Sequence, residues 1–442
     1  MIARLAVRDL RDSWLLWSAA AFVAAAGAFV ALIPATVIES ALPVRGVTSL
    51  ALLAIGGTVI VFTVVSVVVV TASVARATID ARRSTFGLWQ VSGVLPRQVA
   101  LVVFAQVALV AVLGAVPGAA LGLWFGPGFA RETLAAALGD FGAHVGMAGA
   151  LVAVAVVVAV VCLAAIPAAR RAGQTPPVRL LTDIDESNGD RKLGRARALA
   201  GKVVGAAVLV LIVYQLIVSL PGSVDEGGSQ SLLIGPVIIT LLCLSGRRAM
   251  ATLARAWTAI VPKSWSISFF LARADVSRSR DGASAVIPFV VSIGLPVTFL
   301  AGTSVAASAA GSPVGNSSGG TALILFGPVL LAAIGGGAAL LLRSVQRERE
   351  SSVLHSLGAG VSVLGVQRLW EAAIVVVSAA LVAIFALVLT VVTEVTALSA
   401  AYSSTAVYLD GRPLIITVGL CLTVALSVAA SGVPAIARRS RK

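Results

Sequence analysis

The stretch RRSTFGLWQVSGVLPRQ at residues 82–98 lies between two long apolar runs, and the stretch RERESSVLHSLGAG at residues 347–360 lies between two others. Each begins with charged residues, continues with apolar residues at short intervals, and reaches a glycine, Gly93 or Gly358. A charged helix–glycine–helix element between membrane spans predicts a docking surface for a soluble partner. It occurs twice, at the same point of two similar halves, and is the most informative feature of the chain.

Apolar residues in both stretches have helical spacing. Phe86 and Trp89 are three residues apart, as are Leu354 and Leu357, so in each copy the pair shares one face of a helix. A plain hairpin with an interfacial helix would show the same spacing. Because the pattern recurs at matched positions, we favour a shared function over that interpretation.

The two glycines are placed to end these helices. Gly93 and Gly358 can each adopt the left-handed conformation that closes a helix at its C-terminal end. In the first copy Pro96 can open the next helix at its first turn, and in the second copy Ser362 can cap it. The sequence therefore predicts a span that extends beyond the membrane, turns sharply and re-enters.

The composition identifies a membrane protein. Of 442 residues, 59% are hydrophobic and only 12% are charged, which is more apolar surface than a soluble core needs. A helix requires roughly 20 mostly apolar residues to cross the hydrocarbon core. Ten such runs occur, near residues 14–33, 49–75, 99–123, 145–167, 203–220, 231–246, 284–304, 321–342, 369–392 and 414–437. We expect an all-α polytopic membrane protein with about ten transmembrane helices, of which the fifth and sixth are the shortest.

Basic residues indicate the topology. The formal net charge is +14 at pH 7, and arginine and lysine collect in alternate connections between the apolar runs. Few lie in the opposite connections, among them Arg45, Arg131 and Arg412. Loops rich in these residues stay on the cytoplasmic side, so both termini are expected in the cytoplasm, as an even number of spans requires. The charge is a topology signal, and no nucleic-acid partner is expected.

The two halves align with an offset of about 265 residues, which pairs Gly93 with Gly358 and Gln106 with Glu371. Each half contributes four spans, and two central spans join the halves, so the repeats are parallel. The predicted organisation is a first four-helix repeat at 1–171, a cytoplasmic linker at 172–202, a central helix pair with its cytoplasmic connection at 203–264, and a second four-helix repeat at 265–442.

Further motifs complete a family pattern. Glu371-Ala372 lies near the start of a long span, and other spans end with PAARR at 167–171 and PAIARR at 434–439. Together with the repeated element, these motifs resemble the FtsX-like permeases, the membrane subunits of MacB-type ABC transporters, over both four-span halves. The chain departs from familiar members because its 34–49 connection is short and it has no segment long enough for a large extracellular domain.

The resemblance implies a separate ATPase. The chain has no G-x-x-x-x-G-K-[ST] phosphate-binding motif, so ATP and Mg are expected in the partner, a cytoplasmic ABC ATPase dimer with two ATPases per permease. This chain is then not an enzyme and holds no cofactor of its own. In the family the repeated element docks onto the ATPase, and the residues that match it here are Arg82, Arg83, Phe86, Trp89, Gly93, Arg97, Arg347, Arg349, Leu354, Leu357 and Gly358.

A glycine ladder lies within the third predicted span. Gly114, Gly118 and Gly122 follow a small-xxx-small spacing, which allows the backbones of two helices to approach closely. We interpret the ladder as a helix-packing surface rather than a ligand site.

Few other polar residues lie inside the predicted spans. Gln106 and Glu371 are a polar pair at matched positions, and for Glu371 an ion pair near Arg368 or a solvated position is preferred over proton coupling. Glu394 is expected at the outer end of the ninth span. No metal-ligand spacing occurs.

The function predicted from this pattern is a permease subunit in a bacterial plasma membrane. It would couple the ATPase to export or extraction of an amphipathic or hydrophobic substrate in contact with membrane lipids: a lipid, a peptide or an antimicrobial. Two alternatives stay open. One is a secondary transporter driven by an ion gradient. The other is a non-transporting permease that passes ATPase motion to a partner such as a membrane sensor kinase.

Overall fold

The computed structural model describes residues 14–138, 142–173, 207–219, 231–245, 247–262, 266–278, 285–309, 318–346, 360–399 and 411–431. Within these ranges the regular structure is helical, with no strand. Eight of the described helices are long and apolar enough to cross a membrane. The prediction of an all-α polytopic membrane protein is confirmed.

Two of the predicted spans are shorter helices in the described part of the chain. Ala207–Ser219 falls in the fifth apolar run and Leu233–Cys243 in the sixth. Both are below the roughly 20 residues that a perpendicular crossing requires. Ten complete spans therefore stay a prediction.

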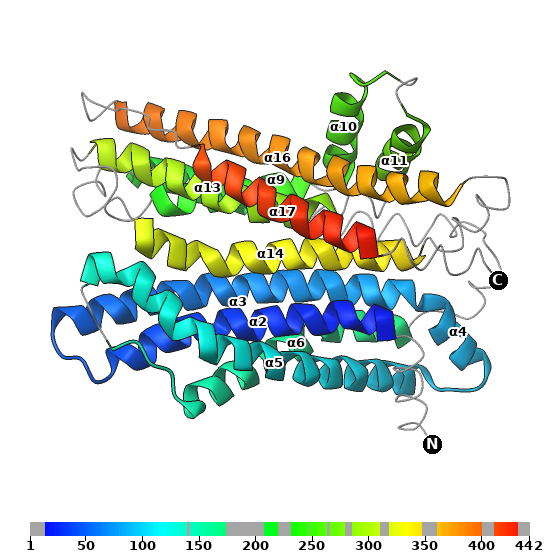
Figure 1. The fold of residues 1–442 in the computed structure, drawn as a ribbon, viewed down its shortest axis with the longest axis horizontal. Helices are drawn as coiled ribbons and strands as arrows, with labels where there is room; N and C mark the ends of the chain where they lie inside the picture. Colours follow the sequence, from blue (N-terminus) through cyan, green and yellow to red (C-terminus); the bar gives the residue numbers. More distant parts are fainter. Residues whose placement is uncertain are drawn as a thin grey trace. The chain divides into compact units, whose positions relative to one another are not determined.

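The chain packs as two compact units. The described helices of unit 1 are α2 (Trp14–Ala41), α3 (Val47–Ala81), α4 (Arg83–Val91), α5 (Pro96–Leu138), α6 (Met147–Gly173) and α14 (Ser318–Gln346). In Figure 1, α2, α3 and α14 lie side by side, and α2 also packs along α5 and α6. Helix α2 continues through Pro34 to Ala41, so the connection to α3 is shorter than the predicted 34–49.

Unit 2 is built around the longest of its described helices. These helices are α9 (Ser231–Ser245), α10 (Arg247–Thr258), α11 (Ile267–Arg278), α13 (Val286–Ala309), α16 (Val361–Ser399) and α17 (Arg412–Ser431). Helix α16 packs against α13, α9, α10 and α11. The Trp257 indole N–H donates to Ser378 Oγ over 2.9 Å, which joins α10 to α16.

Helix boundaries recur with the repeat offset. Two pairs of starts are each separated by 265 residues: those of α5 and α16 at Pro96 and Val361, and those of α6 and α17 at Met147 and Arg412. Helix boundaries are set by nearby residues in the sequence, so matched boundaries indicate matched sequence patterns in the two halves. The agreement supports the alignment of the two halves.

Helix α14 lies in the predicted second repeat but packs in unit 1. A Cβ added to Gly327 would lie 3.3 Å from Thr63 Oγ1, and one added to Gly335 would meet the side chain of Val70. Residue numbers rise together along both helices, so α14 and its counterpart α3 run parallel. Val70 and Gly335 are themselves separated by the repeat offset. The two equivalent helices thus meet at equivalent positions.

Candidate functional site

The first copy of the repeated element forms a sharp turn between α3 and α5, at one end of unit 1 (Figure 1). We call residues 82–95 the elbow. Helix α4 ends there with two hydrogen bonds: Gly93 N–H donates to the Gln90 carbonyl over 3.1 Å, and Val94 N–H donates to the Trp89 carbonyl over 3.0 Å. Gly93 has a φ of 94°. This is a Schellman cap, and it confirms the predicted left-handed glycine.

Helix α5 begins at Pro96, as its sequence predicts. Proline suits the first position of a helix, because a backbone N–H at that position would have no acceptor within the helix. The side-chain oxygen of Gln98 accepts a hydrogen bond from Leu95 N–H over 3.2 Å, which satisfies the backbone group just before the helix. The predicted cap of the second copy is wrong: α16 begins at Val361, so Ser362 lies inside its first turn.

Replacing Gly93 by alanine tests the turn. No atom lies within 4 Å of a Cβ built at this position, so the penalty is the left-handed backbone alone, about 1–2 kcal/mol. Amide exchange of residues 88–95 should accelerate roughly tenfold, since ~1.4 kcal/mol is a factor of ten in the opening equilibrium. The Gly93→Asn variant should show a smaller change, because asparagine tolerates this conformation. Unchanged exchange in Gly93→Ala would contradict the assignment.

Phe86 anchors the elbow to the bundle. Its side chain is 1% exposed and packs with Val99 and Val103 of α5 and Ala169 of α6. Burying a phenylalanine contributes about 1.5–3 kcal/mol. Trp89 packs edge-on against the Phe86 ring with centroids 5.6 Å apart. Helix α4 is therefore attached to the two helices that follow it.

Arg82 completes this anchor. Its side chain is buried, and its Cζ lies 5.6 Å from the centroid of the Phe86 ring, a geometry for a cation–π contact. Arg83 begins α4, and Arg97 is exposed in the first turn of α5. Of the predicted docking residues in the first copy, Arg82 and Phe86 thus face inward, whereas Arg97 faces outward.

The outer surface of the elbow is an apolar ridge of Leu88, Val91 and Leu95, exposed by 66%, 63% and 61%. Leu88 and Val91 are three residues apart on α4, and Leu95 follows the turn. Sequence reasoning did not single out these residues. The signal was present, because helical spacing that turns Phe86 inward turns Leu88 away from it.

Comparison with known proteins finds one family over this region. Residues 57–177 match the model of the FtsX-like permease C-terminal family. No curated protein matches the chain significantly. The FtsX-like segment contains most of α3, all of α4 and α5, and α6. The elbow and its anchor therefore lie inside the matched segment.

The glycine ladder of this FtsX-like segment lies against α2. A Cβ added to Gly114 would fall on the carbonyl oxygen of Ala21, and one added to Gly118 on that of Ala25. At Gly122 it would lie 2.6 Å from the Leu32 side chain. Backbone atoms thus occupy the space that side chains would need. The ladder permits the close approach of α2 and α5.

The matched polar pair is buried in both copies. Gln106 on α5 and Glu371 on α16 are each largely shielded from solvent. Each lies the same number of residues after the start of its helix, and the two helix starts are one repeat offset apart. Glu394, predicted at the outer end of the ninth span, lies five residues before the end of α16 and is 0% exposed. The remaining docking residues, Arg347, Arg349, Leu354, Leu357 and Gly358, lie outside the described residues.

Proposed function

We propose that this chain is the membrane subunit of an ABC transporter and that a separate ATPase docks on the elbow ridge. The observation that carries the proposal is the two-sided elbow: Leu88 and Val91 face outward, while Phe86 on the same helix is buried against α5 and α6. A load on the ridge is thereby passed to helices that cross the membrane. The family match over residues 57–177 supports the same role.

The proposed arrangement places the elbow and both termini in the cytoplasm of a bacterial cell, because loops rich in arginine stay on that side. Arg347–Gly358 would form the second docking element, so two ATPases, each binding ATP and Mg, would serve one permease. The two contacts would be unequal, since Pro96 and Arg97 in the first copy correspond to Val361 and Ser362 in the second.

The proposed substrate is amphipathic or hydrophobic and partitions into the membrane. The described helices of both units carry large exposed apolar side chains, such as Leu113 and Trp124 on α5 and Ile415 on α17, which suit contact with lipid. A lipid, a hydrophobic peptide or an antimicrobial fits this setting. A partner such as a sensor kinase would instead make the chain a transmitter of ATPase motion.

Substitution of the ridge tests the docking proposal. In the Leu88→Glu, Val91→Glu double variant, two carboxylates replace the apolar contact surface, and we expect at least a tenfold loss of ATPase recovered with the full chain from native membranes in mild detergent. The recovered chain would be identified by its phosphate-binding motif and by ATP hydrolysis. Thermal unfolding of the variant should stay close to that of the wild type, because both positions are exposed.

Val47→Glu is the matched control. Val47 is 84% exposed and begins α3, at the end of that helix away from the elbow. This variant should retain the ATPase. Recovery of the wild-type chain without any ATPase, or full recovery with the double variant, would overturn the proposal.

One observation favours a carrier driven by an ion gradient as a second candidate. Both carboxylate oxygens of Glu394 are buried and have no hydrogen-bond partner among the described residues, and an acid within a span is a functional candidate. Substrate uptake by vesicles under an ion gradient, with ATP omitted, would favour the carrier. Uptake that requires ATP and survives an uncoupler would favour the ABC permease.

A further inference from the structure

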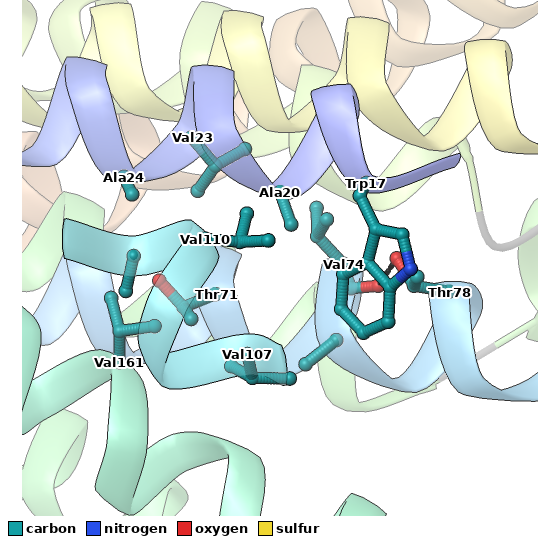
Figure 2. A pocket seen from close by; sticks show the side chains of 12 residues that line it. Trp17, Ala20, Val23, Ala24, Thr71, Val74, Thr78, Val107, Val110 and Val161 are labelled. Atoms are coloured by element: carbon teal, nitrogen blue, oxygen red, sulfur yellow. Dashed lines mark hydrogen bonds between the residues drawn. The ribbon is translucent and has the colours of Figure 1, made fainter. Parts of the chain in front are cut away.

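The cavity inside unit 1 is too small to hold a lipid. It lies between α2, α3, α5 and α6, beside the Trp17 ring, and its volume is about 20 Å³ (Figure 2). Roughly 10–15 Å³ is the space that a single water needs. The cavity is therefore no site for a lipid, and the outer surfaces of the helices are where one can bind.

Helices α10 and α11 form a basic surface on unit 2. Arg255 of α10 is exposed, and Arg248 lies seven residues before it, so the two positions share one face of the helix. Another face of α10 is buried at Met250, Ala254 and Thr258. Together the two helices carry five arginines and one acid: Arg247, Arg248, Arg255, Arg273, Arg278 and Asp275. Their charge therefore suits a negatively charged occupant.

Large apolar side chains are exposed next to this basic surface. Ile260 lies two residues after the end of α10, and Ile267 begins α11; they are 83% and 74% exposed. Phe270 follows Ile267 by three residues on α11 and is 45% exposed. Exposed apolar side chains beside arginines are typical of helices that lie in the headgroup layer of a membrane, where the apolar groups reach the acyl chains.

Both helices are attached to the side of a membrane-crossing helix. The Trp257 indole N–H donates to Ser378 Oγ, and the rings of Phe269 and Trp370 pack edge-on with centroids 5.3 Å apart. Ser378 and Trp370 lie within the part of α16 that is apolar enough to cross a membrane. In Figure 1, α10 and α11 lie beside α16 and cross its direction. A surface beside a span faces lipid, which favours a lipid over a soluble protein as its occupant.

We propose that α10 and α11 form a binding surface for an anionic phospholipid, in the leaflet beside the first half of α16. The headgroup phosphate accepts hydrogen bonds from the Arg255 guanidinium, whose Nε donates to the Ala251 carbonyl over 3.2 Å and whose terminal N–H groups point away from that bond. The acyl chains lie against Ile260, Ile267 and Phe270. This surface belongs to unit 2 and does not depend on an ATPase at the elbow.

Titration with lipid tests the surface. Phosphatidylglycerol or phosphatidylcholine with the same acyl chains would be added to the full chain in mild detergent, and amide exchange of residues 249–260 would be followed. Phosphatidylglycerol at ten times its Kd should slow this exchange about tenfold, and phosphatidylcholine should change it less than twofold. In Arg255→Gln the concentration of phosphatidylglycerol that gives half of the protection should rise about fivefold, the typical contribution of one basic side chain near charged lipid. Arg255→Lys should retain most of the protection.

Arg45→Gln is the matched control. Arg45 is exposed in the connection between α2 and α3, and its substitution should leave the protection of α10 unchanged. Thermal unfolding of Arg255→Gln without added lipid should match that of the wild type, because Arg255 is exposed. Equal protection by the two lipids, or full protection in Arg255→Gln, would overturn the proposal. Loss of the ATPase from Arg255→Gln with normal protection by phosphatidylglycerol would show that α10 docks a protein instead.

Discussion

The Gly118→Val variant is expected to lose about 3 kcal/mol of folding free energy, the upper end of the usual range for an overpacked site. The Cβ at this position would fall on the backbone carbonyl oxygen of Ala25, which cannot move aside as a flexible side chain can. To make room, α2 and α5 must separate along the face on which they pack. Native proteins have only about 5–15 kcal/mol of stability, so the loss is a large fraction of the total.

Gly128→Val is the matched control for this prediction. Gly128 lies on the same helix, and no atom stands within 4 Å of a Cβ built there. Thermal unfolding in mild detergent and the monodisperse fraction on size exclusion would measure both variants. We expect a marked decrease for Gly118→Val and little change for Gly128→Val. Equal behaviour of the two would show that the ladder does not hold α2 against α5.

The elbow was predictable from sequence because its signals are local. Gly93 and Pro96 each act through their own backbone, by allowing a positive φ and by fixing φ at a helix start. The structure places the helix end and the helix start at these residues. The second copy shows the limit of such reasoning. The N-cap position of α16 is Gly360, so Ser362 is two residues too far along the chain to cap the helix, and an error of one or two residues is ordinary at helix ends.

Helix length was not predictable, because hydropathy marks only the part of a helix that lies in hydrocarbon. Arg131 was interpreted as part of an outer connection, yet it lies inside α5, which continues to Leu138. At 1.5 Å per residue a helix of 43 residues is about 65 Å long, roughly twice the hydrocarbon thickness. Charged residues can continue a helix once it has left the lipid.

Faces and long-range packing were also beyond the sequence. The spacing placed Phe86 and Trp89 on one side of α4, but it did not reveal that this side faces the bundle. Because that side faces inward, Leu88 on the opposite side is exposed and available to a partner. Nor did it reveal that α14 packs with α3. That contact exists because Gly335 leaves room for the side chain of Val70. The two residues are far apart in the chain, so no local pattern connects them.

The Phe86→Ala variant is expected to release the elbow from the bundle. Truncating a buried phenylalanine costs about 3–5 kcal/mol, and here the lost contacts are those that hold α4 to α5 and α6. Because α4 is a short helix at one end of the unit, we expect local opening rather than global unfolding. A cost of 3 kcal/mol corresponds to an increase of about 100-fold in amide exchange across the elbow. Hydrogen exchange read by mass spectrometry would measure it.

Leu88→Ala separates anchoring from docking. Leu88 is on the same helix but exposed, so its truncation should leave amide exchange of the elbow within about twofold of the wild type, as surface substitutions usually do. If the ridge binds the ATPase, Leu88→Ala should weaken that association, whereas Phe86→Ala should both loosen the elbow and uncouple ATP hydrolysis from the membrane helices. Rapid exchange in both variants, or in neither, would contradict an elbow whose inner face attaches it to the bundle while its outer face binds a partner.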